Sequence, residues 1–255
     1  MIEVWELTLP ELSGEESRRA YVYLPEEALR DERLRFPVLY MFDGHNVFFD
    51  EDATYGKSWG LGAYLDAHQT PLIVAAVECS HDPDNGRISE YAPYSLSPRE
   101  FGTIRGRGPL TMDWLIRSFK PEIDRCYPTL PDRRHTFIAG SSMGGLMSLY
   151  AVSRFNAVFS RAAALSPSLD FGPDKLAALI RTADIAADTV IYMDMGETEL
   201  GWRNTARNFR RFSRLLLERG VRLTARIVPG GQHCEASWEK QIPFFLPALL
   251  YELEE

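Results

Sequence analysis

Two short segments of the chain place a serine between two glycines in the pattern G-x-S-x-G, centred on Ser58 and Ser142. A serine nucleophile uses this pattern where a strand ends in a strained turn, with a helix starting directly behind it. Residues 134–139 form an apolar, strand-like run before Ser142, and residues 144–154 have a helical pattern. Ser58 instead follows a polar stretch, which indicates a loop or a helix N-terminus. Ser142 is therefore the candidate nucleophile.

A serine nucleophile needs a neighbouring general base, which is normally histidine. Among the five histidines of the chain, His233 has the most suitable position. It follows the last strand-like run, residues 222–228, in a glycine-rich turn suited to presenting a side chain over a sheet edge. We therefore predict His233 as the base.

The acid that orients the base is expected after the strand-like run 188–194. Three carboxylates compete for this role there: Asp194, Glu197 and Glu199. Asp194 falls at the end of the run, whereas the two glutamates lie in the following loop. We favour Glu199, but spacing alone leaves Glu197 open, and a solvated acidic loop is the alternative for all three.

Acyl transfer also needs two backbone N–H donors for the negative oxygen of the tetrahedral intermediate. The residue after the nucleophile, Met143, is the first expected donor. The second is expected in the turn after the apolar run 36–42, where we predict the backbone of His45. An ordinary Asp-Gly turn is the alternative for that segment.

Eight short apolar or alternating runs bounded by turn formers have the pattern of strands. They cover residues 2–8, 19–24, 36–42, 71–78, 134–139, 161–166, 188–194 and 222–228. Helical patterns cover residues 111–126, 144–154, 174–183, 203–219 and 236–252. Two prolines, Pro243 and Pro247, are expected to break or kink the last of these.

Strands that alternate with helices require crossover connections, which produce a mainly parallel sheet with helices on both faces. The first two runs have no helical pattern between them, so we expect an antiparallel N-terminal hairpin. Reacting groups in such sheets gather at the carboxyl ends of the strands. We therefore expect them just after residues 42, 78, 139, 166, 194 and 228.

The composition is that of a folded protein with one core of ordinary size: 255 residues, of which 45% are hydrophobic. The net charge of −8 argues against nucleic acid as a partner. No apolar run approaches membrane-spanning length, and the acidic N-terminus lacks the pattern of a secretory signal. We expect a single domain over residues 1–255, in the cytoplasm. The three cysteines lack metal-site spacing, so we predict neither a metal nor a cofactor.

These segments together resemble the putative esterase family of α/β-hydrolases, which includes esterase D and the feruloyl and enterochelin esterases. The resemblance is carried by residues 38–46, 123–129, 139–145, 164–168 and 230–233, with Trp238. It implies an α/β-hydrolase fold, with Ser142 as nucleophile and His233 as base. It also favours Glu199 as the acid, since the family's acid lies three residues after the glycine of that loop. Many members have aspartate there.

The resemblance further implies that residues 87–91 border the active site, with Arg87, Tyr91 and Trp238 as substrate contacts. The alternative for the first two is an Arg87–Glu90 ion pair with Tyr91 as a packing residue. A basic run with partial helical spacing is interpreted as a solvated face, with an anion site as the alternative: Arg203, Arg207, Arg210, Arg211 and Arg214. Cys234, next to His233, is expected to be a packing residue, with a thiol that makes activity sensitive to oxidation as the alternative.

The leading hypothesis is a serine hydrolase without a cofactor that cleaves small carboxylic esters through an acyl-enzyme. A siderophore trilactone is one candidate substrate, since a glutamate acid resembles the enterochelin-type esterases and the arginines suit an anionic ligand. The second hypothesis is a non-catalytic binding protein that retains the fold and its pocket. The joint presence of nucleophile, base, acid and elbow glycines argues against it.

Overall fold

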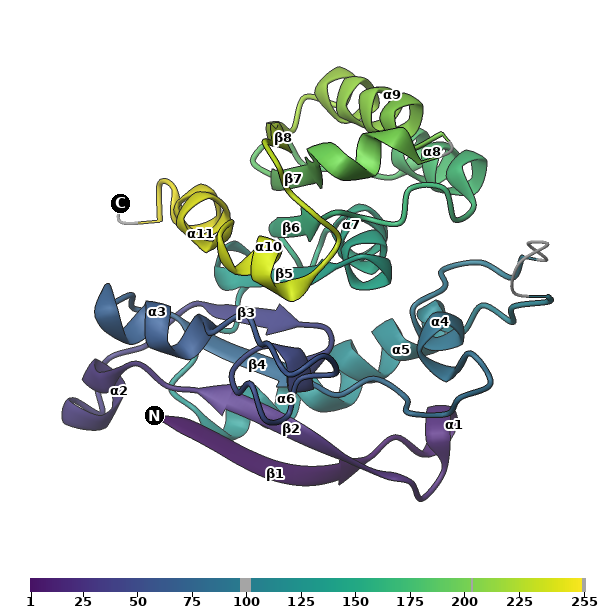
Figure 1. Cartoon of the computed structure of the whole chain (residues 1–255). Helices are drawn as coiled ribbons and strands as arrows, with labels where there is room; N and C mark the ends of the chain where they lie inside the picture. Colours follow the sequence, from purple (N-terminus) through teal and green to yellow (C-terminus); the bar gives the residue numbers. More distant parts are fainter. Residues whose placement is uncertain (97–101, 203, 254–255) are drawn as a thin grey trace.

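The computed structural model describes residues 1–96, 102–202 and 204–253 (Figure 1). Eight strands form one sheet in the order β1-β2-β4-β3-β5-β6-β7-β8. Their bounds are β1 (Ile2–Thr8), β2 (Ser17–Tyr23), β3 (Val38–Met41), β4 (Ile73–Val77), β5 (Thr136–Ser141), β6 (Arg161–Leu165), β7 (Val190–Gly196) and β8 (Arg222–Val228). Each strand falls on one of the predicted runs.

The sheet is parallel except at its N-terminal edge. β1 pairs with β2 antiparallel, β2 pairs with β4 antiparallel, and the remaining neighbours are parallel. The predicted mainly parallel sheet with an antiparallel N-terminal hairpin is confirmed. The expectation of no helix between the first two strands is wrong, because the four-residue helix α1 (Pro10–Ser13) joins them. Its first residue is a proline, which loses no hydrogen bond at that position.

Helices cover both faces of the sheet (Figure 1). One face packs against α3 (Leu61–Ala67), α10 (Glu235–Glu239) and α11 (Ile242–Leu250). The other packs against α5 (Gly108–Trp114), α6 (Lys120–Cys126), α7 (Met143–Arg154), α8 (Pro173–Thr182) and α9 (Thr205–Glu218). Two further short helices are α2 (Glu26–Arg30) and α4 (Gly86–Glu90). Like α1 and α3, they have no counterpart in the predicted helical segments. None of the helices in the described ranges is long and apolar enough to cross a bilayer.

Alternate side chains of a central strand enter the two apolar cores. In β3, Leu39 and Met41 join the core under α3 and α11, whereas Val38 and Tyr40 join the core under α5 to α9. Successive side chains of a strand point to opposite faces, so a strand buried on both faces must be apolar at every position. This burial explains the uninterrupted apolar runs of the sequence.

Prolines shape two of the predicted helical segments. The pattern over 111–126 forms α5 and α6, joined by a π-helical turn (Leu115–Phe119) just before Pro121. Proline cannot donate the amide hydrogen bond of a regular helix, and an enlarged turn accommodates its ring. The pattern over 236–252 is broken into α10 and α11, with Pro243 in the first turn of α11 and Pro247 inside it. The predicted break is confirmed.

Candidate active site

The turn from β5 into α7 carries Ser142. Its backbone has φ 57° and ψ −119°, a conformation that residues other than glycine rarely adopt. The turn is also tightly packed, because a Cβ added to Gly140 would lie 2.8 Å from the backbone carbon of Gly144. Ser142 therefore stands at the N-terminus of a buried helix, where the unpaired amides and the helix dipole favour negative charge.

Three side chains from separate loops form one hydrogen-bonded chain. His233 Nε2 lies 2.9 Å from Ser142 Oγ, and His233 Nδ1 lies 2.6 Å from Glu199 Oε2. Ser142 follows β5, Glu199 lies in the 3-10 helix η4 (Glu197–Gly201) after β7, and His233 follows β8. The parallel strands thus bring the three side chains to the carboxyl edge of the sheet, as expected.

The Glu199 carboxylate is buried and fully engaged by donors. Its Oε2 contacts His233, and its Oε1 accepts hydrogen bonds from Ser166 Oγ at 2.6 Å and from the Gly196 amide at 2.9 Å. Burial acts to raise the pKa of Glu199, but the hydrogen bonds from His233 and Ser166 outweigh it and hold this pKa below its ordinary value. Glu199 is therefore held as a carboxylate against the imidazole.

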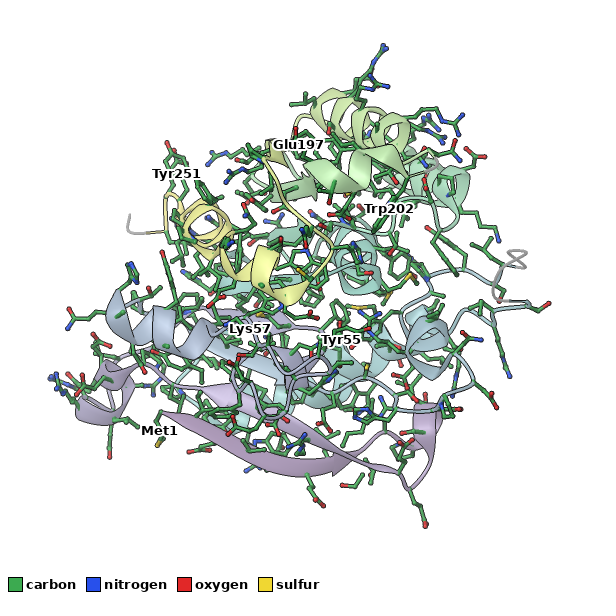
Figure 2. The ribbon with its side chains drawn as sticks, in the orientation of Figure 1. Met1, Tyr55, Lys57, Glu197, Trp202 and Tyr251 are labelled. Atoms are coloured by element: carbon green, nitrogen blue, oxygen red, sulfur yellow. The ribbon has the colours of Figure 1, made fainter. Side chains whose placement is uncertain are left out.

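The other two carboxylates near β7 have different partners. Glu197 accepts the Gly230 amide at 2.8 Å and lies on the surface (Figure 2). Asp194 is buried and accepts the Ser166 amide at 3.0 Å and the Tyr192 hydroxyl at 2.9 Å. Burial raises the pKa of Asp194 from 3.8 to about 7. Of the carboxylates considered from the sequence, Glu199 is the one that reaches His233.

The turn after β3 holds the second predicted amide donor. It is the 3-10 helix η1 (Gly44–Asn46), whose first internal hydrogen bond runs from the Asn46 amide to the Asp43 carbonyl at 2.8 Å. The amide of His45 precedes that bond, so it has no partner within the turn. Met143 is the first residue of α7, and its amide is likewise outside the helical hydrogen bonds. A Cβ at Gly44 would lie 2.9 Å from the Val77 backbone, which explains the glycine before His45.

Arg87 and Tyr91 support this turn. Arg87 donates to both carboxylate oxygens of Asp43 at 2.7 and 2.8 Å, and the Tyr91 hydroxyl accepts the Asp43 amide at 3.1 Å. The alternative of an Arg87–Glu90 pair is wrong, because Glu90 accepts two hydrogen bonds from the buried Arg18 at 2.8 and 2.5 Å. Tyr91 is only 3% exposed and packs on Phe42, as a packing residue would.

Two cavities meet at the hydrogen-bonded chain. The first, of about 330 Å³, has a mixed polar and apolar lining. It includes Ser142, His233, His45, Tyr55, His81, Arg87, Glu235 and Trp238, among others. The second, of about 190 Å³, lies beyond His233 and is lined by Ser168, Leu169, Met195 and Trp202, among others. The predicted contacts Arg87 and Trp238 thus face the first cavity.

Several cavity residues were not singled out from the sequence. Ser168 Oγ lies 3.4 Å from Ser142 Oγ, and its place just after a predicted strand was the available signal. Glu235 is buried near His233, and burial raises its pKa. Tyr55 and Trp202 are 81% and 53% exposed, on loops whose pattern carries no signal of a site (Figure 2). Asp43, His45 and Cys79 form the one group of potential metal ligands found in the described part of the chain.

The remaining candidates lie outside this arrangement. Ser58 is buried in the loop before α3 and donates to Asp50 at 2.7 Å, as its loop interpretation requires. Three arginines of α9 are exposed, Arg207, Arg210 and Arg214, and Arg211 pairs with Asp174 at 2.7 Å. Arg203 is outside the described residues. Cys234 is a half-buried free thiol at the N-cap of α10.

Several solved structures of esterases share this architecture. A ferulic acid esterase superposes with a TM-score of 0.69 at 17% identity, over 98% of this chain and 97% of that one. The siderophore hydrolase EstA from Aspergillus nidulans gives 0.72 at 17%, over 95% and 93%. The enterobactin esterase FES from Shigella flexneri gives 0.73 at 17%, over 98% of this chain and 59% of that one. The fold is therefore the predicted α/β-hydrolase fold.

The sequence itself matches the family described as "Putative esterase" over residues 13–249. This chain belongs to that family and is a carboxylic ester hydrolase. It is also 25% identical to the uncharacterized protein YbbA of Bacillus subtilis (strain 168), over 187 residues, 72% of this chain and 69% of that protein.

Proposed function

We propose that this protein is a serine esterase that cleaves small carboxylic esters through an acyl-enzyme. In this proposal Ser142 is the nucleophile, His233 the general base and Glu199 the acid. The observation that carries it is the unbroken hydrogen-bonded chain from Ser142 through His233 to Glu199, with contacts of 2.9 and 2.6 Å. Ser142 and His233 lie in segments that carry the family resemblance, and Glu199 stands three residues after the glycine of its loop, where that resemblance expects the acid.

The geometry supports a two-step reaction. His233 Nε2 takes the proton as Ser142 Oγ attacks the ester carbonyl, and then gives it to the leaving alcohol. Glu199 holds Nδ1–H, which fixes the tautomer and stabilises the charged imidazole. The amides of Met143 and His45 stabilise the oxyanion, and each such donor typically contributes on the order of 10²–10³ in rate. Water then attacks the acyl-enzyme with His233 again acting as base.

The two cavities suggest how an ester is divided between its acyl and alcohol parts. The first cavity has a mixed lining that includes the charged Arg87 and the Glu235 carboxyl. The second is more apolar, with Leu169, Met195 and the exposed Trp202, whose ring centre lies 5.3 Å from that of His233. A substrate with one polar and one apolar or aromatic part fits this division. The net charge of −8 further favours a small molecule over a nucleic acid.

A siderophore trilactone is the second candidate substrate. Two of the similar structures are named as a siderophore hydrolase and an enterobactin esterase. The proposed acid, Glu199, is also a glutamate, which resembles the enterochelin-type esterases. The arginines of α9 support this candidate little, because Arg211 is paired with Asp174 and Arg214 with Glu218.

Initial hydrolysis rates over an ester panel test the proposal. The panel contains acetyl, butyryl, octanoyl and feruloyl esters and a siderophore trilactone, with wild type compared with Ser142→Ala. We expect at least one ester to be hydrolysed by wild type alone. Equal rates for the two proteins would refute Ser142 as the nucleophile. No hydrolysis, together with no labelling of folded wild type by a fluorophosphonate, would favour the non-catalytic binding protein.

A further inference from the structure

Three potential metal ligands lie together where β3 and β4 end. Asp43 and His45 follow β3, and Cys79 follows β4. Because β3 and β4 are parallel neighbours, with Met41 opposite Ala76, the segments after them meet at the same edge of the sheet. One ligand atom from each of the three residues lies within 4.8 Å of the other two, and each residue is 4% exposed.

The His45 ring supplies an independent indication that something binds here. Its Nε2 is hydrogen-bonded to Thr54 Oγ1 at 3.0 Å, whereas its Nδ1 is buried without a partner among the described residues. A buried polar atom without a partner costs free energy, and nearly all such atoms in folded proteins have one. Nδ1 is thus the ring nitrogen left for a ligand, and neutral imidazole nitrogen binds transition metals readily.

The donor set selects the kind of ion. A thiolate, an imidazole and a carboxylate are the ligands that Zn²⁺ prefers, whereas Ca²⁺ and Mg²⁺ take oxygen ligands. The Asp43 oxygens each accept one bond from Arg87, and a carboxylate oxygen has a second lone pair for an ion. Zinc can therefore bind Asp43 without breaking the ion pair.

The cavity beside Ser142 provides the route of entry. It reaches both His45 and Cys79, so an ion can arrive from solvent and keep a water molecule as its fourth ligand. The buried Glu235 carboxyl lines the same cavity and offers a further oxygen near the entrance. The Arg87 guanidinium also lines it, with its charge paired to Asp43. A Zn²⁺ ion held there occupies space beside Ser142 and is bonded to the residue whose amide faces the oxyanion in the proposed mechanism.

We propose that Asp43, His45 and Cys79 form an inhibitory Zn²⁺ site beside the catalytic serine. The Cys79 thiol loses its proton to solvent as the S–Zn bond forms, and His45 Nδ1 and an Asp43 oxygen each donate an electron pair. Only the inhibition rests on the proposed esterase function, because metal binding is measured without any substrate.

Direct binding to the whole chain tests this site. Co²⁺ serves as a spectroscopic probe, because a thiolate ligand adds a near-ultraviolet charge-transfer band, and Zn²⁺ affinity is measured by competition with a chromophoric chelator. We expect one equivalent of metal with the thiolate band in wild type. Cys79→Ser should lose the band and bind Zn²⁺ at least about 100-fold more weakly, since even outer-shell partners contribute 10–100-fold. His45→Gln should weaken binding as well.

Cys126→Ser and Cys234→Ser are the matched controls, and both should keep the band. Absence of the band in wild type would overturn the proposal. So would a Cys79→Ser variant that binds Zn²⁺ as tightly as wild type, since the ion would then lie elsewhere, for example on His233. Circular dichroism verifies that each variant is folded. If Cys79→Ser does not fold, the presence or absence of the thiolate band in wild type still tests the proposed site. Where an ester is turned over, the Zn²⁺ concentration for half-inhibition should match the binding constant and rise with Cys79→Ser.

Discussion

Ser166 donates its hydroxyl to Glu199 Oε1 at 2.6 Å, which joins the loop after β6 to the loop after β7. The same hydroxyl accepts the indole N–H of Trp238 at 3.1 Å, and the Ser166 amide binds Asp194 at 3.0 Å. Each group is buried, so each hydrogen bond is difficult to replace by water. Ser166 therefore holds the carboxylate that contacts His233.

Ser166→Ala tests this positioning role. It leaves the Trp238 N–H buried without a partner, which costs about 1–3 kcal/mol of stability. It also frees one side of Glu199, so kcat for an ester substrate should fall about tenfold with little change in KM. Ser168→Ala is a suitable comparison, since Ser168 contacts Ser142 rather than Glu199. An unchanged kcat in folded Ser166→Ala would contradict the role.

Glu199→Gln and Glu197→Gln form a matched pair that separates the two candidate acids. Glu199→Gln replaces the carboxylate at His233 Nδ1, and loss of the correct tautomer lowers kcat by on the order of 10⁴. Glu197 contacts the Gly230 amide at the surface, so Glu197→Gln should leave kcat within about twofold. Steady-state kinetics on one ester measure both. The reverse order of effects would transfer the role to Glu197.

Asp194 makes stability depend on pH in a direction that can be measured. Burial raises its pKa from 3.8 to about 7 in the folded protein, so between these values the folded state binds a proton that the unfolded state has lost. The contribution of Asp194 to the unfolding free energy therefore falls as pH rises from about 4 to about 7. Asp194→Asn removes this dependence and can still accept the Ser166 amide.

The expected result is a variant that gains stability relative to wild type as pH increases. Urea unfolding of both proteins at pH 5 and pH 8 gives the difference directly. A difference that stays constant over this range would show that Asp194 titrates normally.

The Arg87–Asp43 pair should stabilise the turn that carries His45. Arg87→Met leaves the buried Asp43 carboxylate without its cation. Because Arg87 is itself only half-buried, the cost should lie below that of a fully buried pair, at about 1–3 kcal/mol. Adding Asp43→Asn removes the unpaired charge, so the double variant should be more stable than Arg87→Met alone. Chemical unfolding of the four proteins of this cycle measures the coupling. If the two substitutions change the free energy of unfolding additively, Arg87 and Asp43 are not coupled and the stabilising role of the pair is contradicted.

The sequence predicts those parts of the site that depend on local pattern. The strained turn at Ser142 and the helix behind it are encoded within ten residues, and His233 follows a recognisable strand. The sheet was predictable for a similar reason, since burial on both faces makes β3 and the centre of β5, residues 137–139, apolar without interruption. The short helix α1 escaped prediction because four residues carry no periodicity.

Other features depend on how distant segments meet. Glu197 and Glu199 are two residues apart, and only the fold of η4 decides which one reaches His233. Arg87 pairs with Asp43 rather than Glu90 because the ends of two strands bring them together. The cluster containing Cys79 is also assembled from separate loops, so no spacing of metal ligands appears in the sequence.

Covalent labelling of Ser142 tests the central claim most directly. Wild type is treated with a fluorophosphonate, digested and analysed by mass spectrometry, in parallel with Ser142→Ala and with Ser58→Ala as the control for the other G-x-S-x-G segment. We predict one adduct, on the peptide containing Ser142, in wild type and Ser58→Ala, and no adduct in Ser142→Ala. An adduct that persists in folded Ser142→Ala would contradict the assignment, as would folded wild type that hydrolyses an ester but is never modified at Ser142.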